Sequence, residues 1–262
     1  MTATSDLTEW IEDSRVERDP QGDQLGISNT WVSPGHRYFY MATPKVACSK
    51  IKLVLQELEG YEVPPAPLRI HWRDTPGLSF VPSLADLPIH DAVRALTSPD
   101  WFRFAFVRNP YARLLSAYTQ KVRDLNSPWV GFREAVRRSA GVPTVPGAAP
   151  AVVEFPDFVR YIGEQDDGVR DGHWRSQVGT LHVDRIRYDF VGRFESFTED
   201  LTQVLRKLRA PDTLLATVGL VVNATARVPL ASVYDQDLAD YVYRVFRDDF
   251  EAFEYHRNDW TD

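Results

Sequence analysis

Residues 38–58 hold the combination of residue types best suited to binding an anion. Tyr38–Ala42 is dominated by aromatic residues and Met, which predicts a buried strand, and apolar residues recur at helical spacing between Ile51 and Leu58. A strand that turns sharply into a helix presents unpaired backbone N–H groups and the positive end of the helix dipole. The turn adds side-chain donors from Lys45, Ser49 and Lys50.

This turn, residues 43–50, is therefore a candidate phosphate or sulfate site. An ordinary strand–helix connection with surface lysines is the alternative interpretation. The turn is not the Gly-rich nucleotide loop, because it has neither the glycines nor the Gly-Lys-Ser/Thr ending of that motif.

A second strand–turn–helix unit, with a basic residue at its turn, spans residues 101–125. Trp101–Val107 consists largely of aromatic residues and Val without a breaker, so it predicts the clearest core strand of the chain. Pro110 suits the first helical position because its missing N–H has no partner there anyway. Arg113 is predicted to lie off the buried face, exposed or in a salt bridge. The predicted buried face consists of Leu114, Leu115, Tyr118 and Val122.

The remaining chain alternates predicted strands and helices. Helices are expected at residues 7–16, 89–96, 155–163, 196–208 and 235–250, and strands at residues 69–72 and 188–194. This alternation predicts an α/β fold with three layers, α/β/α, around a mostly parallel central sheet. We divide the chain into a polar N-terminal leader, 1–30, and a single domain, 31–262. Within that domain the Pro-, Gly- and Ala-rich residues 141–153 are expected to form a mobile loop.

Composition limits the class of protein. The 262 residues are 44% hydrophobic and 12% aromatic, which predicts a folded globular chain. A net charge of −7 argues against binding to nucleic acid or to an anionic membrane. The single cysteine, Cys48, excludes an intrachain disulfide and a Cys-rich zinc site, and no apolar run is long enough to cross a bilayer. We expect a soluble, cytoplasmic protein.

Two segments together resemble a known family. TPKVACSK (43–50) and FVRNPYARLLSAY (106–118) resemble the two cofactor signatures of sulfotransferases that use 3′-phosphoadenosine-5′-phosphosulfate (PAPS). The resemblance is strongest to the carbohydrate sulfotransferases that act on chondroitin, dermatan and related glycans, and it runs from about residue 38 to residue 257. Weaker echoes are DGHWRSQ, YDFVGRFESFTEDL, NATARVP and YRVFRDDFEAFEY. The resemblance implies a P-loop-like sulfotransferase fold and transfer of a sulfuryl group from PAPS to a hydroxyl.

The resemblance also assigns the donor-binding residues. The first loop of the family wraps the 5′-phosphosulfate, which implies contacts from Lys45, Val46, Ala47, Cys48, Ser49 and Lys50. Lys45 would stabilise charge that builds on the bridging oxygen as the sulfuryl group leaves. The second signature binds the 3′-phosphate, which implies Arg108 and Ser116; they are eight residues, or roughly two helical turns, apart and can face the same side.

Two later residues are implied less directly. Phe194 stands where the family contacts adenine, with a core aromatic as the alternative. Arg227 falls where a late loop closes over the cofactor, so it is a candidate contact to the 3′-phosphate.

Sulfuryl transfer to a hydroxyl needs a general base within hydrogen-bond reach of the acceptor. In related sulfotransferases this is often a His on the strand between the two cofactor signatures, a position that His71 occupies here. His173 is the rival, and acceptor binding is an equally open role for it. No metal is expected, because Lys and Arg supply the positive charge and no clustered His and carboxylate spacing is present.

The chain departs from the Golgi glycan enzymes, because it has neither a membrane anchor nor paired cysteines near His173-Trp174. These departures favour a bacterial-type cytoplasmic enzyme with a carbohydrate, glycosylated or other small-molecule acceptor. Arginines that either line an acceptor groove or form solvated faces are Arg133, Arg137, Arg138, Arg170, Arg175, Arg185 and Arg187.

Two other functions stay open. The missing Gly-Lys-Ser/Thr ending and the lack of an evident Mg²⁺ carboxylate count against a phosphoryl-transfer kinase. Intact Lys45, Arg108 and Ser116 count against a non-catalytic nucleotide-binding module.

Overall fold

The computed structural model describes residues 3–14, 26–64, 70–71, 77–142, 152–219 and 228–261. The chain divides into two compact units. Unit 1 comprises residues 1–107 and 180–225, and unit 2 comprises residues 108–179 and 226–262. The prediction of a single domain from residue 31 stays a prediction. None of the helices in the described ranges is long and apolar enough to span a membrane.

Unit 1 is built on a four-stranded sheet with the order β1-β2-β3-β4. The strands are β1 (Thr30–Ser33), β2 (Tyr38–Met41), β3 (Phe102–Val107) and β4 (Phe190–Arg193). β1 pairs with β2 antiparallel, whereas β2–β3 and β3–β4 are parallel, so the predicted mostly parallel sheet is confirmed. The sequence pattern missed β1 as a separate edge strand, because only a tight turn at 34–37 separates its apolar residues from those of β2.

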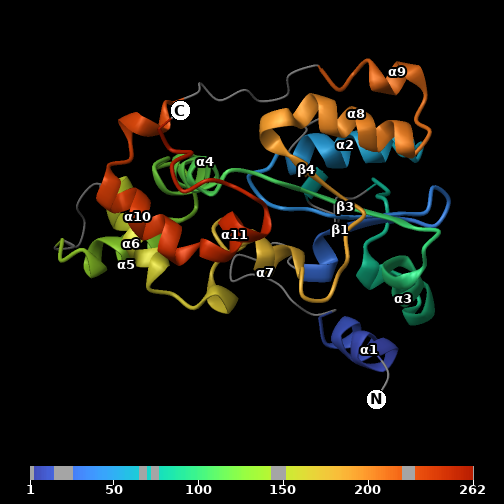
Figure 1. The fold of residues 1–262 in the computed structure, drawn as a ribbon, viewed down its shortest axis with the longest axis horizontal. Helices are drawn as coiled ribbons and strands as arrows, with labels where there is room; N and C mark the ends of the chain where they lie inside the picture. Colours follow the sequence, from blue (N-terminus) through green and yellow to red (C-terminus); the bar gives the residue numbers. More distant parts are fainter. Residues whose placement is uncertain are drawn as a thin grey trace. The chain divides into compact units, whose positions relative to one another are not determined.

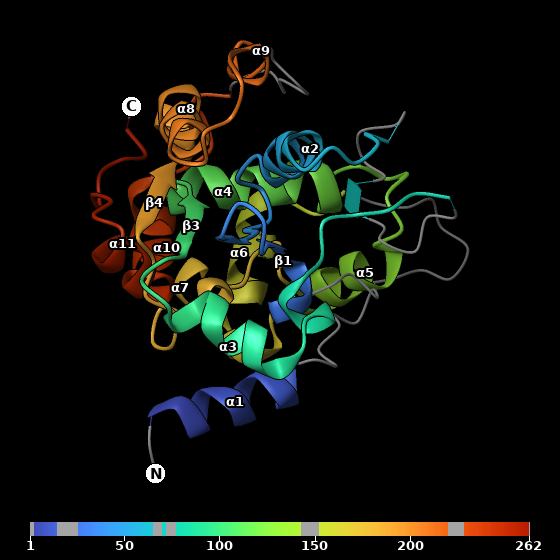
Figure 2. The same cartoon turned by 90° about the vertical axis from the view of Figure 1, so that its right-hand side faces the viewer.

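Helices cover both faces of this sheet. The helices α2 (Cys48–Leu58) and α8 (Phe197–Lys207) lie over one face and α3 (Ile89–Thr97) lies over the other, with α1 (Ala3–Asp13) packed against α3 (Figures 1 and 2). The short α9 (Asp212–Leu215) packs beside α8. The three-layer arrangement is thus confirmed in unit 1.

The core under α2 and α8 is aromatic, because β2 and β3 alternate large rings toward that face. Tyr40 and Phe104 stack with ring centroids 5.1 Å apart, and Phe106 lies 5.7 Å from Phe197 of α8. All four belong to one hydrophobic cluster, in which Tyr40, Phe104 and Phe106 are fully buried. Burial of this aromatic surface holds α2, and with it the turn before α2, against the sheet.

Unit 2 is helical. It contains α4 (Pro110–Ala117), α5 (Val130–Ser139), α6 (Phe155–Gly163), α10 (Gln236–Val245) and α11 (Arg247–Ala252). The predicted helix at 110–125 is α-helical only to Ala117 and then forms one π-helical turn, Tyr118–Val122. The predicted helix at 235–250 is broken at Phe246, and α5 was not predicted. The short α7 (Gln177–Leu181) contains the boundary between the units.

Some predicted elements differ or fall outside the described ranges. The strand expected at 69–72 is wrong where it can be judged, because Ile70 and His71 form a 3₁₀ turn. The leader helix expected at 7–16 exists as α1, whereas residues 15–25 are outside the description. Most of the expected mobile loop, 143–151, also lies outside the described residues.

Candidate active site

The turn between β2 and α2 has an unusual backbone. Lys45 and Ala47 adopt left-handed conformations, with φ of 72° and 51°, although neither is glycine. Ala47 caps α2, and its carbonyl accepts hydrogen bonds from the N–H groups of Lys50 and Ile51 at 2.9 and 3.2 Å. Val46 is fully buried and anchors the turn in the core. Left-handed non-glycine residues are costly and concentrate at functional loops, which fits an anion-binding role for this turn.

His71 contacts the first turn of α2 through both ring nitrogens. Its Nε2 lies 2.7 Å from the Ser49 hydroxyl and its Nδ1 lies 3.3 Å from Lys52 Nζ, which also donates to Asn29 Oδ1 at 2.7 Å. An ammonium group only donates, so Nδ1 must accept from Lys52 and Nε2 then carries the hydrogen that Ser49 accepts. In this arrangement His71 supports the loop rather than offering a lone pair to an acceptor.

The other residues of the turn differ in their contacts and burial. Lys50 donates to the Thr217 carbonyl at 2.9 Å, and burial lowers the pKa of Lys50. Lys45 and Cys48 are half-buried, and Cys48 is a free thiol. Phe194 begins a short 3₁₀ turn and is partly buried against the core cluster, which agrees with its alternative interpretation as a core aromatic and leaves adenine contact untested.

In unit 2 the backbone of Arg108 is held by a side chain. The buried Gln177 accepts from the Arg108 N–H at 2.9 Å and donates to the Arg108 carbonyl at 2.8 Å. Ser116 is half-buried on α4, and Arg227 lies outside the described residues. The sequence analysis did not single out Gln177, although Gln177 is the last residue of the DGHWRSQ segment that resembles the family.

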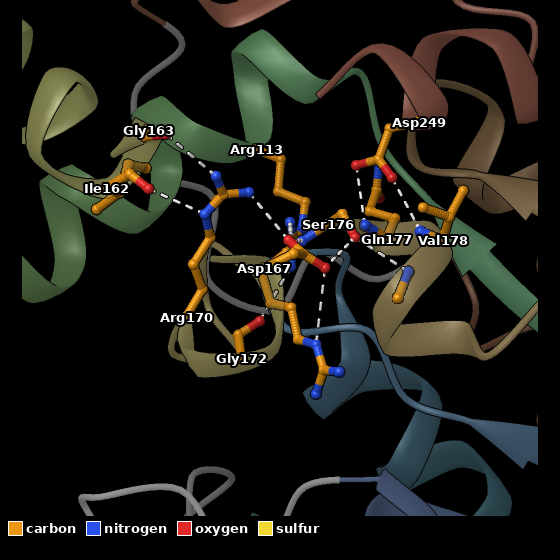
Figure 3. Close-up of polar contacts among 12 residues, drawn as sticks. Arg113, Ile162, Gly163, Asp167, Arg170, Gly172, Ser176, Gln177, Val178 and Asp249 are labelled. Carbon is orange, nitrogen blue, oxygen red and sulfur yellow. Dashed lines mark hydrogen bonds and ion pairs between the residues drawn. The ribbon is translucent and has the colours of Figure 1, made fainter. Parts of the chain in front are cut away.

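Arg113 corrects a prediction. It is 2% exposed rather than solvated, and its guanidinium donates to the carbonyls of Arg175 at 2.7 Å and Gly172 at 3.0 Å (Figure 3). Burial lowers its pKa to about 10, so it stays charged at neutral pH. Arg133 and Arg170 are buried as well, and each donates to backbone carbonyls instead of lining a solvated face. Their aliphatic stems pack while the guanidinium groups satisfy loop carbonyls.

The turn that Arg113 holds carries His173. Asp171 Oδ1 lies 2.6 Å from His173 Nδ1 and also accepts from the His173 backbone N–H at 2.8 Å. A carboxylate at Nδ1 fixes the hydrogen on that nitrogen and makes Nε2 the basic atom. A histidine oriented in this way is a second candidate base beside His71, which the sequence favoured for that role.

No group of His, Cys, Asp or Glu side chains in the described part of the chain could hold a metal ion.

Unit 1 is thus a layered α/β unit in which a turn with a lysine and two left-handed residues joins β2 to α2. The chain belongs to the sulfotransferase family, whose model matches residues 28–256. It is 34% identical over 201 residues to carbohydrate sulfotransferase 14 of Mus musculus, covering 75% of this chain and 52% of that protein. It is 31% identical over 195 residues to carbohydrate sulfotransferase 8 of Mus musculus, covering 72% of this chain and 45% of that protein.

A third relative, carbohydrate sulfotransferase 11 of Danio rerio, is 26% identical over 237 residues, covering 86% of this chain and 66% of that protein. The chain thus spans about half the length of the most similar of these curated relatives. No solved structure matches. These relatives are animal proteins and do not support the expected bacterial type, and the cytoplasmic location stays a prediction.

Proposed function

We propose that this protein transfers a sulfuryl group from PAPS to a hydroxyl of a carbohydrate acceptor. The observation that carries the proposal is the turn at 43–50, whose sequence resembles the family's donor loop and in which Lys45 and Ala47, just before α2, are left-handed. The names of the relatives, all carbohydrate sulfotransferases, support a glycan acceptor. The Lys45 ammonium would stabilise the charge that develops on the departing phosphate oxygen.

Donor binding follows the family signatures. The turn at 43–50 would take the 5′-phosphosulfate through backbone N–H groups at the start of α2 together with Ser49 and Lys50. Arg108 and Ser116 would take the 3′-phosphate, for which the planar fork of an arginine is suited. Arg227 stays a further candidate for that phosphate.

His173 is the general base that the local geometry favours. Asp171 lies 2.6 Å from its Nδ1, which makes Nε2 the basic nitrogen that would take the proton of the acceptor hydroxyl. His71 is the second candidate, because hydrogen bonds in an unliganded protein can rearrange when a substrate binds.

Calorimetric titration with 3′-phosphoadenosine-5′-phosphate (PAP), the desulfated product, tests the donor assignment. We expect micromolar affinity, about −8 kcal/mol, that collapses in Arg108→Ala. Binding of ATP with Mg²⁺ in place of PAP would overturn the proposal in favour of a kinase.

Lys45→Ala tests for catalysis as opposed to binding alone. We expect the sulfation rate to fall by about 100-fold or more while PAP affinity changes less than about tenfold, because the charge that Lys45 stabilises forms only in the transition state. Lys207→Ala, which removes an exposed lysine of α8, is the matched control. A loss of PAP affinity as large as the loss of rate would instead indicate a binding residue.

The two histidines are separated by the same assay on His173→Gln and His71→Gln. If His173 is the base, its variant loses turnover about 100-fold or more at unchanged PAP affinity. The His71 variant, by disturbing Ser49, should mainly weaken PAP binding. The reverse pattern would make His71 the base.

A further inference from the structure

The backbone of Arg108 is clamped by one amide side chain. Gln177 is fully buried, and its Oε1 and Nε2 form hydrogen bonds of 2.9 and 2.8 Å with the N–H and the carbonyl of the same residue, Arg108. A primary amide paired in this way imitates the neighbouring strand of a sheet, at the point where β3 has just ended. The pair fixes the direction in which the Arg108 backbone leaves the strand.

Gln177 is itself held by a buried carboxylate. Asp249 of α11 is 1% exposed and accepts from the backbone N–H groups of Gln177 and Val178, both at 2.9 Å (Figure 3). These N–H groups belong to the first turn of α7 and have no acceptor within that helix. Asp249 therefore sets the position of the Gln177 backbone from a segment 72 residues away in the sequence.

The residue before Gln177 is fixed by a second carboxylate. Asp167 accepts from the Ser176 backbone N–H at 2.8 Å and from the Ser176 hydroxyl at 2.5 Å. Asp167 is in turn bonded to Arg170 at 2.9 Å. The backbone on both sides of the Gln177 side chain is thus anchored by buried or half-buried ionic groups.

We propose that Gln177 and Asp249 are positioning residues that preorganise Arg108 for the 3′-phosphate of the donor. This inference rests on the proposed function, in which Arg108 binds that phosphate. Two hydrogen bonds to the backbone of one residue remove conformational freedom that Arg108 would otherwise lose on binding, and preorganisation of this kind raises affinity without adding a contact. The fork of an arginine gains most from it, because paired hydrogen bonds need a fixed orientation.

The proposal predicts an effect confined to ligands with a 3′-phosphate. We would measure the affinity of wild type and Gln177→Met for PAP and for adenosine 5′-monophosphate, which lacks that phosphate. Methionine keeps the shape of glutamine but cannot pair with the Arg108 backbone. We expect PAP affinity to fall about tenfold and adenosine 5′-monophosphate affinity to stay within about twofold.

Gln56→Met is the matched control. Gln56 is also a fully buried glutamine whose amide bonds to backbone groups, accepting from the Val81 N–H at 3.3 Å and donating to the Ser79 carbonyl at 2.6 Å. Its loss should lower stability as the Gln177 change does, yet leave the ratio of the two affinities unchanged. A ratio altered equally by both variants would overturn the proposal, since general destabilisation would then explain it.

Arg108→Ala separates failure of the inference from failure of the proposed function. If Arg108→Ala leaves the ratio of PAP affinity to adenosine 5′-monophosphate affinity at the wild-type value, Arg108 does not bind the 3′-phosphate. The proposed function's assignment of Arg108 is then wrong. If Arg108→Ala lowers the ratio while Gln177→Met does not, the inference alone is overturned. In the double variant the Gln177 effect should vanish, because it acts only through Arg108.

Gln177→Glu keeps the test decisive if the Met variant fails to fold. A carboxylate can still accept from the Arg108 N–H but cannot donate to its carbonyl, so we expect the same selective loss for PAP. An unchanged affinity ratio in this variant would overturn the proposal.

Discussion

Single residues in unit 2 show how burial changes the role of a charge. Arg113, expected to be exposed or in a salt bridge, is buried and donates to two carbonyls of the turn that carries His173. The spacing of residues along the helix cannot reveal this burial, because the carbonyls belong to a segment about 60 residues further along the chain. An arginine at such a site acts as a structural donor, and its replacement would leave buried carbonyls unsatisfied.

Asp249 leads to a prediction about pH. Burial raises the pKa of Asp249 to about 6, against 3.8 for an ordinary Asp. The N–H groups of Gln177 and Val178 and the charge of Arg113 oppose this rise, and the charge of Asp167 adds to it. Between pH 3.8 and about 6 the folded protein therefore keeps a proton on Asp249 that the unfolded chain has released. For this reason Asp249 makes the free energy of unfolding fall as the pH rises from about 4 to about 6. The full effect is about 3 kcal/mol.

Asp249→Asn removes this titration. We expect the unfolding free energy of wild type minus that of the variant, measured by urea denaturation, to fall by up to about 3 kcal/mol between about pH 4 and about pH 7. Other carboxylates titrate in both proteins and cancel in the difference. A difference that stays constant with pH would show that Asp249 has an ordinary pKa.

At the scale of elements, the contact between β3 and β4 depends on a missing side chain. Gly192 of β4 pairs with Phe106 of β3, and a Cβ added there would lie 2.5 Å from the Phe106 ring. The ring belongs to the buried aromatic cluster and has little room to move. Glycine at this position lets β4 pair closely with β3.

Gly192→Ala should therefore destabilise the protein by about 1–3 kcal/mol. The measurement is the free energy of unfolding in urea. Gly131→Ala is the control, since its added Cβ meets nothing within 4 Å in α5 and should be neutral or slightly stabilising. Equal effects of the two substitutions would mean that the Phe106 ring moves aside without cost.

On the scale of the whole molecule, unit 1 is assembled from two separate parts of the chain. β1, β2 and β3 come from residues 1–107, whereas β4 and α8 come from residues 180–225. The second part supplies the partner for one edge of β3 and the core residues Leu201, Val204 and Leu205. The sheet is therefore incomplete until the chain has passed through unit 2.

A fragment of residues 1–107 should not fold cooperatively. Without β4 and α8 it exposes the aromatic face of β3 and leaves an unpaired edge. We expect no cooperative thermal transition by circular dichroism. Joining residues 1–107 to residues 180–225 through a short flexible linker should restore the transition, and a cooperative transition in the shorter fragment alone would contradict this account.

Local pattern in the sequence determined much of this protein. The aromatic strand at 102–107, the basic turn before α2 and the helix at 155–163 follow from short-range spacing, because burial of one face imposes a fixed period. Motif order was enough to indicate the family that the comparison then showed.

Tertiary structure alone decided the partners of the polar residues. The pairing of Gln177 with Arg108, the burial of Arg113 and the contact of His71 with Ser49 join segments 69, 59 and 22 residues apart. No local pattern encodes such contacts, since a hydrogen bond depends on where two distant backbones meet in space. The sequence indicated the candidate site residues, and the fold determined which polar partners hold them in place.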